Sequence, residues 1–210
     1  MVDMSNFQDI ATEIEKKLIE SDSAREELMQ LSRTVLKCSG QSIENFHRNQ
    51  VDSAKLKIVE AEEALNKVKD LQEEKQGNYH LGIIYAAMQE YTEAKLLHEL
   101  FTTGKISSYE EIKVTEAAYL LGVADLIGEL RRYVLEKLVE GEIEEAKTYY
   151  ETMKELYATF MQVECGKNLV SDFRRKKDTA RILIERTLSD LFVAVQGRKL
   201  EERFDKSLED

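Results

Sequence analysis

Apolar side chains recur every three or four residues along most of the chain, which is the spacing of amphipathic helices. Between 143 and 162, for example, Ala146, Tyr150, Met153, Tyr157 and Phe160 follow one helical face, which we expect to lie in the core rather than at a subunit contact. The sequence contains no proline, and most of its nine glycines lie where such a pattern ends. These features favour long, nearly uninterrupted helices over β-rich architectures.

The pattern predicts seven helices, at about 7–20, 24–48, 53–75, 79–103, 115–140, 143–162 and 169–196. A capping box, Ser23-x-x-Glu26, is expected to begin the second helix. Gly197 is expected to end the last one, leaving a charged tail at 198–210 that frays. No repeat and no long linker divides the chain. We therefore predict a single all-α domain over residues 1–210, built as a bundle of long antiparallel helices.

Two of the predicted helices carry acidic residues within their apolar faces. At about 100° per residue, Glu90 and Glu93 share a face with apolar residues of the helix at 79–103, and Asp125 and Glu129 do so on the helix at 115–140. The short break between these helices fits an antiparallel hairpin. Such a hairpin would place Glu93 level with Asp125 and Glu90 level with Glu129.

Carboxylates gathered in apolar surroundings repel one another unless a cation or shared protons neutralise them. A hard divalent cation, Mg²⁺ or Mn²⁺, is the natural candidate for a set of carboxylate ligands. A single pair of acids on a helix is usually only solvated surface. Here two pairs are expected to lie level with each other on neighbouring helices. The sequence alone then supports solvated surface and a metal site equally.

The formal net charge of −11 argues against a protein whose whole outer surface coats nucleic acid, but it allows local basic surfaces. One polar and partly basic stripe follows the helix at 24–48, where solvated surface is the simpler explanation and phosphate contact the alternative. Between 167 and 186, seven Lys and Arg stand against three acids. The candidate nucleic-acid-binding residues of these two segments are Arg33, Lys37, His47, Arg48, Arg174, Lys177 and Arg181.

Several classes of protein are disfavoured by what the sequence does not contain. It has no run of about 18 apolar residues and no signal-peptide pattern at its start, and its two cysteines suggest a reducing compartment, so we expect a cytoplasmic protein. The glycine-rich phosphate loops, the Cys-x-x-Cys pairs and the nucleophile elbow are absent. Glu44-x-x-His47 has the spacing of a di-iron ligand pair, but a ferritin-like site needs that spacing on two helices.

Two motifs in the acid-bearing helices resemble signatures of the TRAX (translin-associated factor X) branch of the translin family. M-Q-E-Y-T-E-A at 88–94 resembles F-Q-E-Y-V-E-A, and Y-L-L-G-V-A-D-L-I-G-E-L-R-R at 119–132 resembles Y-L-L-G-V-A-D-L-T-G-E-L-M-R. Shorter similarities are L-S-R-T-V at 31–35 with His47-Arg48, and Asp190-Leu191 with Gly197. The chain therefore resembles a TRAX-like member of the family over most of its length.

This resemblance implies a seven-helix protomer that assembles into a closed, hollow homo-oligomer, typically an octamer. It also implies Mg²⁺-dependent endoribonuclease activity on single-stranded RNA. The catalytic and metal-binding acids of the TRAX branch correspond to Glu90, Glu93, Asp125 and Glu129, whereas translin-branch proteins lack this set and bind without cutting. Where TRAX proteins carry a basic pair before the His-Arg motif, this chain has Gly40-Gln41.

Two alternatives to the nuclease belong to other functional classes. The chain could form an oligomer that binds single-stranded DNA or RNA without cutting it, with the acids as a structural cation site. It could also be a purely structural helical scaffold. Metal-dependent cleavage separates the nuclease from both, and salt-sensitive binding separates the binder from the scaffold.

Overall fold

The computed structural model describes residues 5–75, 82–166, 169–170 and 172–209, and within these residues the only extended regular structure is helical. The six helices are α1 (Ser5–His47), α2 (Val51–Lys75), α3 (Gly82–Thr103), α4 (Glu116–Val139), α5 (Ile143–Gln162) and α6 (Phe173–Glu209). The predicted all-α class is confirmed. The predicted start of a helix at residue 79 lies outside the described residues.

The prediction of seven helices is wrong because the first two are one helix. α1 continues through the expected boundary at Ser23, where neither glycine nor proline interrupts the chain. Serine and aspartate are weak helix formers but not helix breakers. Beyond this point Ala24 and Leu28 are buried against neighbouring helices, so packing stabilises the continuation.

The predicted end of the last helix at Gly197 is also wrong. α6 passes through Gly197 and continues to Glu209. A glycine inside a helix costs only about 1 kcal/mol relative to alanine, which a long helix tolerates. The start of α6 is later than expected, because Asp172, with a positive φ of 62°, precedes the helix at Phe173.

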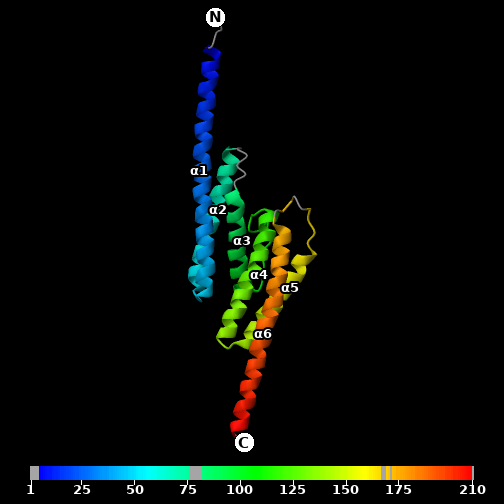
Figure 1. Ribbon diagram of the computed structural model, residues 1–210. Helices are drawn as coiled ribbons and strands as arrows, with labels where there is room; N and C mark the ends of the chain where they lie inside the picture. Colours follow the sequence, from blue (N-terminus) through cyan, green and yellow to red (C-terminus); the bar gives the residue numbers. More distant parts are fainter. Residues whose placement is uncertain (1–4, 76–81, 167–168, 171, 210) are drawn as a thin grey trace.

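The predicted antiparallel hairpin of α3 and α4 is wrong as well, because the two helices run parallel. Phe101 near the end of α3 packs edge-to-face against Tyr133 near the end of α4, and Gln89 in the first half of α3 contacts Asp125. The colours in Figure 1 show the same direction for α1, α3, α4 and α6, with α2 and α5 running the opposite way.

The segment between α3 and α4 makes this parallel arrangement possible by running back along α3. Its 12 residues can span about 40 Å when extended, more than the roughly 33 Å length of the 22-residue α3. Its amide at Ser107 donates to Glu99, the Ser107 carbonyl accepts from the Tyr119 hydroxyl, and Ile112 and Val114 are buried. The segment is therefore part of the packed structure rather than a short turn.

Buried apolar residues form two neighbouring clusters along the bundle. One lies mainly between α1, α2 and α3, together with Ile112, Val114 and Ala118. The other lies between α3, α4, α5 and α6 and includes the end of α1 and the start of α2. Tyr150, Met153 and Phe160 of α5 belong to the second cluster, as expected for a core stripe. None of the described helices has a stretch long and apolar enough to cross a membrane.

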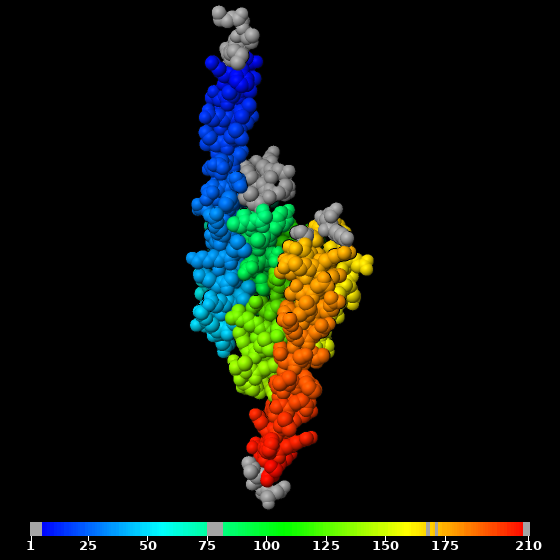
Figure 2. Space-filling model, in the orientation of Figure 1, coloured from blue at the N-terminus to red at the C-terminus, as the bar shows by residue number. Residues whose placement is uncertain are grey.

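Both ends of the molecule extend beyond this packed centre, as Figure 2 shows. The first half of α1 carries an exposed apolar stripe of Phe7, Ile10, Ile14 and Leu18. The last part of α6 carries another, with Phe192, Leu200 and Phe204 exposed. Neither stripe is covered by the residues that the structure describes.

Candidate functional site

The acid-bearing turns of α3 and α4 are brought together by a close helix crossing at Gly122. A Cβ atom at Gly122 would lie 2.7 Å from the Cβ of Thr92 and 2.8 Å from the carbonyl oxygen of Gln89. Only glycine therefore fits here without displacing the α3 backbone. In this parallel register Glu93 lies close to the level of Asp125, and Glu129 lies about one helical turn beyond Asp125 along α4.

The four predicted acids share one electrostatic environment. Burial, followed by the charges of Asp125, Glu90 and Glu129, raises the pKa of Glu93 to about 9. Burial and the charges of Asp125 and Glu129 raise the pKa of Glu90 as well. The structure thus brings Glu90, Glu93, Asp125 and Glu129 together, although by parallel helices rather than the expected hairpin.

The two acids of α4 are held by nitrogen-bearing side chains. Asp125 accepts a hydrogen bond from Gln89 Nε2 at 2.5 Å through Oδ2 and forms an ion pair with Lys176 through Oδ1. Glu129 Oε2 lies 2.7 Å from His47 Nε2. These contacts fix the orientation of both carboxylates.

The two acids of α3 have no such partners. Glu93 is 8% exposed, and neither it nor Glu90 makes a hydrogen bond or an ion pair with any residue that the structure describes. Glu90 points toward α1, where a Cβ atom at Gly40 would lie 3.7 Å from its Oε1. A largely buried carboxylate without a protein partner is stabilised by protonation, by a cation or by water, which can reach it because the Glu93 oxygens are not among the fully buried unpaired atoms.

The donor chemistry of this cluster fits Mg²⁺ or Mn²⁺, because all four side chains offer hard carboxylate oxygens. The unpartnered Glu93 supports that fit. In their present orientations, however, no three His, Cys, Asp or Glu side chains within the described part of the chain could hold a metal ion together. Asp125 is paired with Lys176 in this arrangement, and Glu129 is paired with His47.

His47 has a different position from the one expected of a phosphate-binding residue. Its side chain is 1% exposed and lies between Glu129 and Glu136, with Nδ1 2.8 Å from Glu136 Oε2. It cannot reach a phosphate outside the protein from this position. We therefore revise its role to positioning Glu129.

The other predicted nucleic-acid-binding residues lie at the surface, with one exception. Arg33, Lys37, Arg48, Arg174 and Arg181 are exposed, and two of them form ion pairs with acids on their own helices, Arg48 with Glu44 and Arg181 with Asp178. Lys177 is half-buried and donates to the backbone carbonyls of Met161 and Val163 at the end of α5. Its first role is thus to cap α5.

Sequence reasoning missed Lys176 and Gln89 as members of the site. Lys176 lies on the stripe of α6 that faces the core, between Phe173 and Ala180, both buried. A basic residue at helical spacing between apolar core positions was the available signal. Gln89 immediately precedes Glu90, but its contact with Asp125 depends on the parallel register of α3 and α4.

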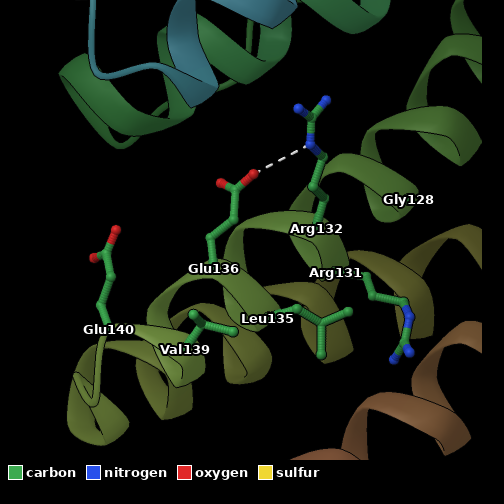
Figure 3. Close-up of a pocket in the computed structure, with 7 residues that line it drawn as sticks. All are labelled: Gly128, Arg131, Arg132, Leu135, Glu136, Val139 and Glu140. Atoms are coloured by element: carbon green, nitrogen blue, oxygen red, sulfur yellow. Dashed lines mark hydrogen bonds and ion pairs between the residues drawn. The ribbon is translucent and has the colours of Figure 1, made fainter.

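Two surface hollows flank the acids along α4. One, of about 500 Å³, is lined by Gly128, Arg131, Arg132, Leu135, Glu136, Val139 and Glu140. Figure 3 shows its two arginines pointing to opposite sides. The other, of about 480 Å³, includes Gln89 and Leu121. Leu121, Asp125, Gly128 and Arg132 share one stripe of α4, so the acids lie between two depressions that an extended chain could follow.

Comparison with known proteins places this chain in a family. The sequence model of the Translin family matches residues 23–187. An uncharacterized protein of Methanocaldococcus jannaschii is 32% identical over 191 residues, which cover 90% of this chain and 84% of that protein.

Solved structures agree with this placement. The structure of an AfC3PO–duplex RNA complex is 37% identical, with a TM-score of 0.81, and the match covers 90% of this chain and 97% of that one. The structure of apo-NeC3PO, 23% identical with a TM-score of 0.76, shares the fold over 92% of this chain and 100% of that one. Because the family match spans most of the chain and a relative above 30% identity covers nine-tenths of it, this protein belongs to the translin family.

Proposed function

We propose that this protein is a metal-dependent endoribonuclease that cleaves single-stranded RNA, as the resemblance to the TRAX branch implies. The observation that carries the proposal is Glu93, which is buried and without a partner beside three other carboxylates. Clustered carboxylates destabilise the fold unless a proton or cation neutralises them, so this arrangement is not expected in a purely structural scaffold.

Glu90, Glu93, Asp125 and Glu129 would hold one or two Mg²⁺ or Mn²⁺ ions. When bound, the metal would neutralise charge on the phosphate and activate a water for attack on phosphorus. Gln89 orients Asp125, and His47 orients Glu129. We assign Glu129 as the acceptor of the water's proton. The water oxygen would form the new P–O bond, and the bond to the leaving oxygen would break as that oxygen takes up a proton from solvent, so that one water is added across the phosphodiester bond.

The RNA would lie along α4, across the two hollows and over the acids. Exposed Arg33, Lys37 and Arg48 on α1 and Arg174 and Arg181 on α6 could contact its phosphates from either side. The related AfC3PO structure contains duplex RNA, which supports RNA as the ligand class. Single-stranded DNA presents the same phosphates and is a second possible ligand.

The same proposal includes self-association into a homo-oligomer, for which the family resemblance suggests an octamer. The uncovered apolar stripes on the protruding parts of α1 and α6 support it, because exposed apolar stripes of this length are typical of helix–helix contacts between subunits. Light scattering at micromolar concentration tests this part. A particle well above dimer size is expected, and a 24.3 kDa monomer would contradict it.

One observation favours the alternative of an oligomer that binds RNA without cutting it. Lys176 already neutralises part of the acid cluster, so the cluster could serve stability alone. Purified protein incubated with labelled single-stranded RNA separates the two functions. We expect fragments with Mg²⁺ and intact RNA with EDTA, with a Glu93→Gln variant inactive and a Glu144→Gln variant, changed at an exposed site on α5, active. Intact RNA in every lane, together with salt-sensitive binding, would favour the binding protein.

A further inference from the structure

Lys176 reaches into the acid cluster from a helix that carries none of the four acids. Its Nζ pairs with Asp125 Oδ1, and both side chains are only about one-fifth to one-quarter exposed, at 19% and 24%. Its charge also extends to α3, since it partly offsets the rise in the pKa of both Glu90 and Glu93. One ammonium group thus acts on three of the four acids.

Both oxygens of Asp125 are occupied by protein groups in this arrangement. Oδ1 faces Lys176 and Oδ2 accepts from Gln89. The Lys176 ammonium at Oδ1 opposes a cation that approaches Asp125, whereas the neutral Gln89 amide at Oδ2 can stay in place when a metal binds. The absence of a three-ligand arrangement among the described side chains agrees with this occupancy.

We propose that Lys176 is a built-in counter-ion, which stabilises the acid cluster without metal and releases Asp125 when a divalent cation binds. This inference rests on the proposed metal site. Lysine suits such an exchange because its ammonium is a single charge on a flexible stem, whereas an arginine fork would hold the carboxylate through two hydrogen bonds.

The released ammonium would stay beside the cluster, because Lys176 lies on the inner stripe of α6, between the buried positions Phe173 and Ala180. That is where the phosphate of a bound RNA would lie under the proposed function. Lys176 would therefore exchange a carboxylate oxygen for a phosphate oxygen, and it acts as a positioning residue that couples metal binding to RNA binding.

The test is the affinity for Mg²⁺ alone, measured by calorimetry on the full-length chain without RNA. Lys176→Met removes the competing charge, and we expect it to bind Mg²⁺ at least about fivefold more tightly than the wild type. Lys176→Arg keeps the charge and should bind Mg²⁺ no more tightly than the wild type. Lys177→Met is the matched control, because it removes the same charge one residue away, where the ammonium contacts backbone carbonyls instead of acids.

Thermal unfolding provides a second readout that also reports folding. Without Mg²⁺, Lys176→Met should melt at a lower temperature than the wild type, and saturating Mg²⁺ should raise its melting temperature by more than it raises that of the wild type. Lys176→Gln, which keeps a hydrogen-bond donor, replaces Lys176→Met if the latter does not fold. Equal or weaker Mg²⁺ affinity in the charge-removing variant, or the same gain in Lys177→Met, would overturn the proposal.

The outcome for Lys176 is separable from the outcome for the nuclease. If the wild type binds Mg²⁺ and the Lys176 variants behave as expected but RNA stays intact, only the proposed function fails. If RNA is cut but Mg²⁺ affinity does not depend on Lys176, only this inference fails.

Discussion

The acids of α3 and those of α4 face each other but are treated differently by the rest of the fold. Asp125 and Glu129 on α4 are held by Lys176, Gln89 and His47, whereas Glu90 and Glu93 on α3 have no hydrogen-bonding partner among the described residues. Glu93 is also the most buried of the four, and its pKa is raised to about 9. One half of the site is therefore oriented in advance, and the other half lacks the positive charge that would stabilise it.

The largest expected effect is on RNA cleavage, and it should be similar for acids of α3 and acids of α4. Glu93→Gln and Asp125→Asn each keep the shape of the side chain and remove one anionic ligand. We expect each to lower the rate of Mg²⁺-dependent RNA cleavage at least about 100-fold, measured with labelled single-stranded RNA. Full cleavage by either variant, in protein free of contaminating nuclease, would remove that acid from the catalytic set.

The stability of the metal-free protein should distinguish the acids of α3 from those of α4. The folded state keeps the Glu93 proton up to about pH 9, while the unfolded chain releases it near 4.5. Because the folded state binds more protons in this range, the free energy of unfolding should fall as pH rises from about 5 to 9, by at most about 1.4 kcal/mol per pH unit. Denaturant unfolding in EDTA at several pH values measures this fall.

Two variants test the origin of this pH dependence. Glu93→Gln should make the free energy of unfolding depend less on pH and should stabilise the metal-free protein at pH 8. Asp125→Asn should stabilise it less, because this change also removes the carboxylate that pairs with Lys176. An identical pH dependence in the wild type and Glu93→Gln would show that Glu93 does not carry the extra proton.

The close crossing of α3 and α4 predicts a smaller loss of stability. Gly122→Ala should lower the free energy of unfolding by about 1–3 kcal/mol, because the added methyl group meets the α3 backbone. Gly128→Ala is the matched control on the same helix, where the nearest atom to a new Cβ is Leu183 Cδ1 at 3.9 Å. The control should be neutral or slightly stabilising, and equal effects at the two glycines would contradict the close approach.

The smallest effect concerns the basic residues outside the acid cluster. Reversing Arg174 and Arg181 to Glu should weaken RNA binding and flatten the dependence of log affinity on log salt by about one unit, measured by fluorescence anisotropy. Reversing Lys147 and Lys154 on α5, which pair with Glu144 and Glu151, should change the salt slope less. Equal slopes for both double variants would show that only total charge matters.

Helical periodicity predicted the helix class, the core stripe of α5 and the pairing of the acids on each helix, because each depends on which residues share a helical face. The four acids do lie together, but the antiparallel hairpin from which this was predicted is wrong. Periodicity could not predict the direction of α4. The parallel arrangement depends on an extended segment that packs Ile112 and Val114 into the core, and helical spacing does not report such a contact. The boundaries near Ser23 and Gly197 failed for a related reason, since local stop signals were weaker than the continuation of long helices.

The site was predicted only in part. The acids were found because carboxylates on apolar stripes are conspicuous in a sequence. Lys176 was missed because it was considered with its basic neighbours, although its position between Phe173 and Ala180 places it on the inner stripe of α6. The role of His47 could not be predicted either, since its contacts with Glu129 and Glu136 lie 82 and 89 residues away in sequence.

The most direct test of the central claim, that the four acids form a cation site, is a calorimetric Mg²⁺ titration of the wild type and of Glu93→Gln, with Glu144→Gln as the control. We expect saturable binding in the wild type and the control, and binding that is lost or strongly weakened in Glu93→Gln. Identical titration curves for all three proteins would contradict it.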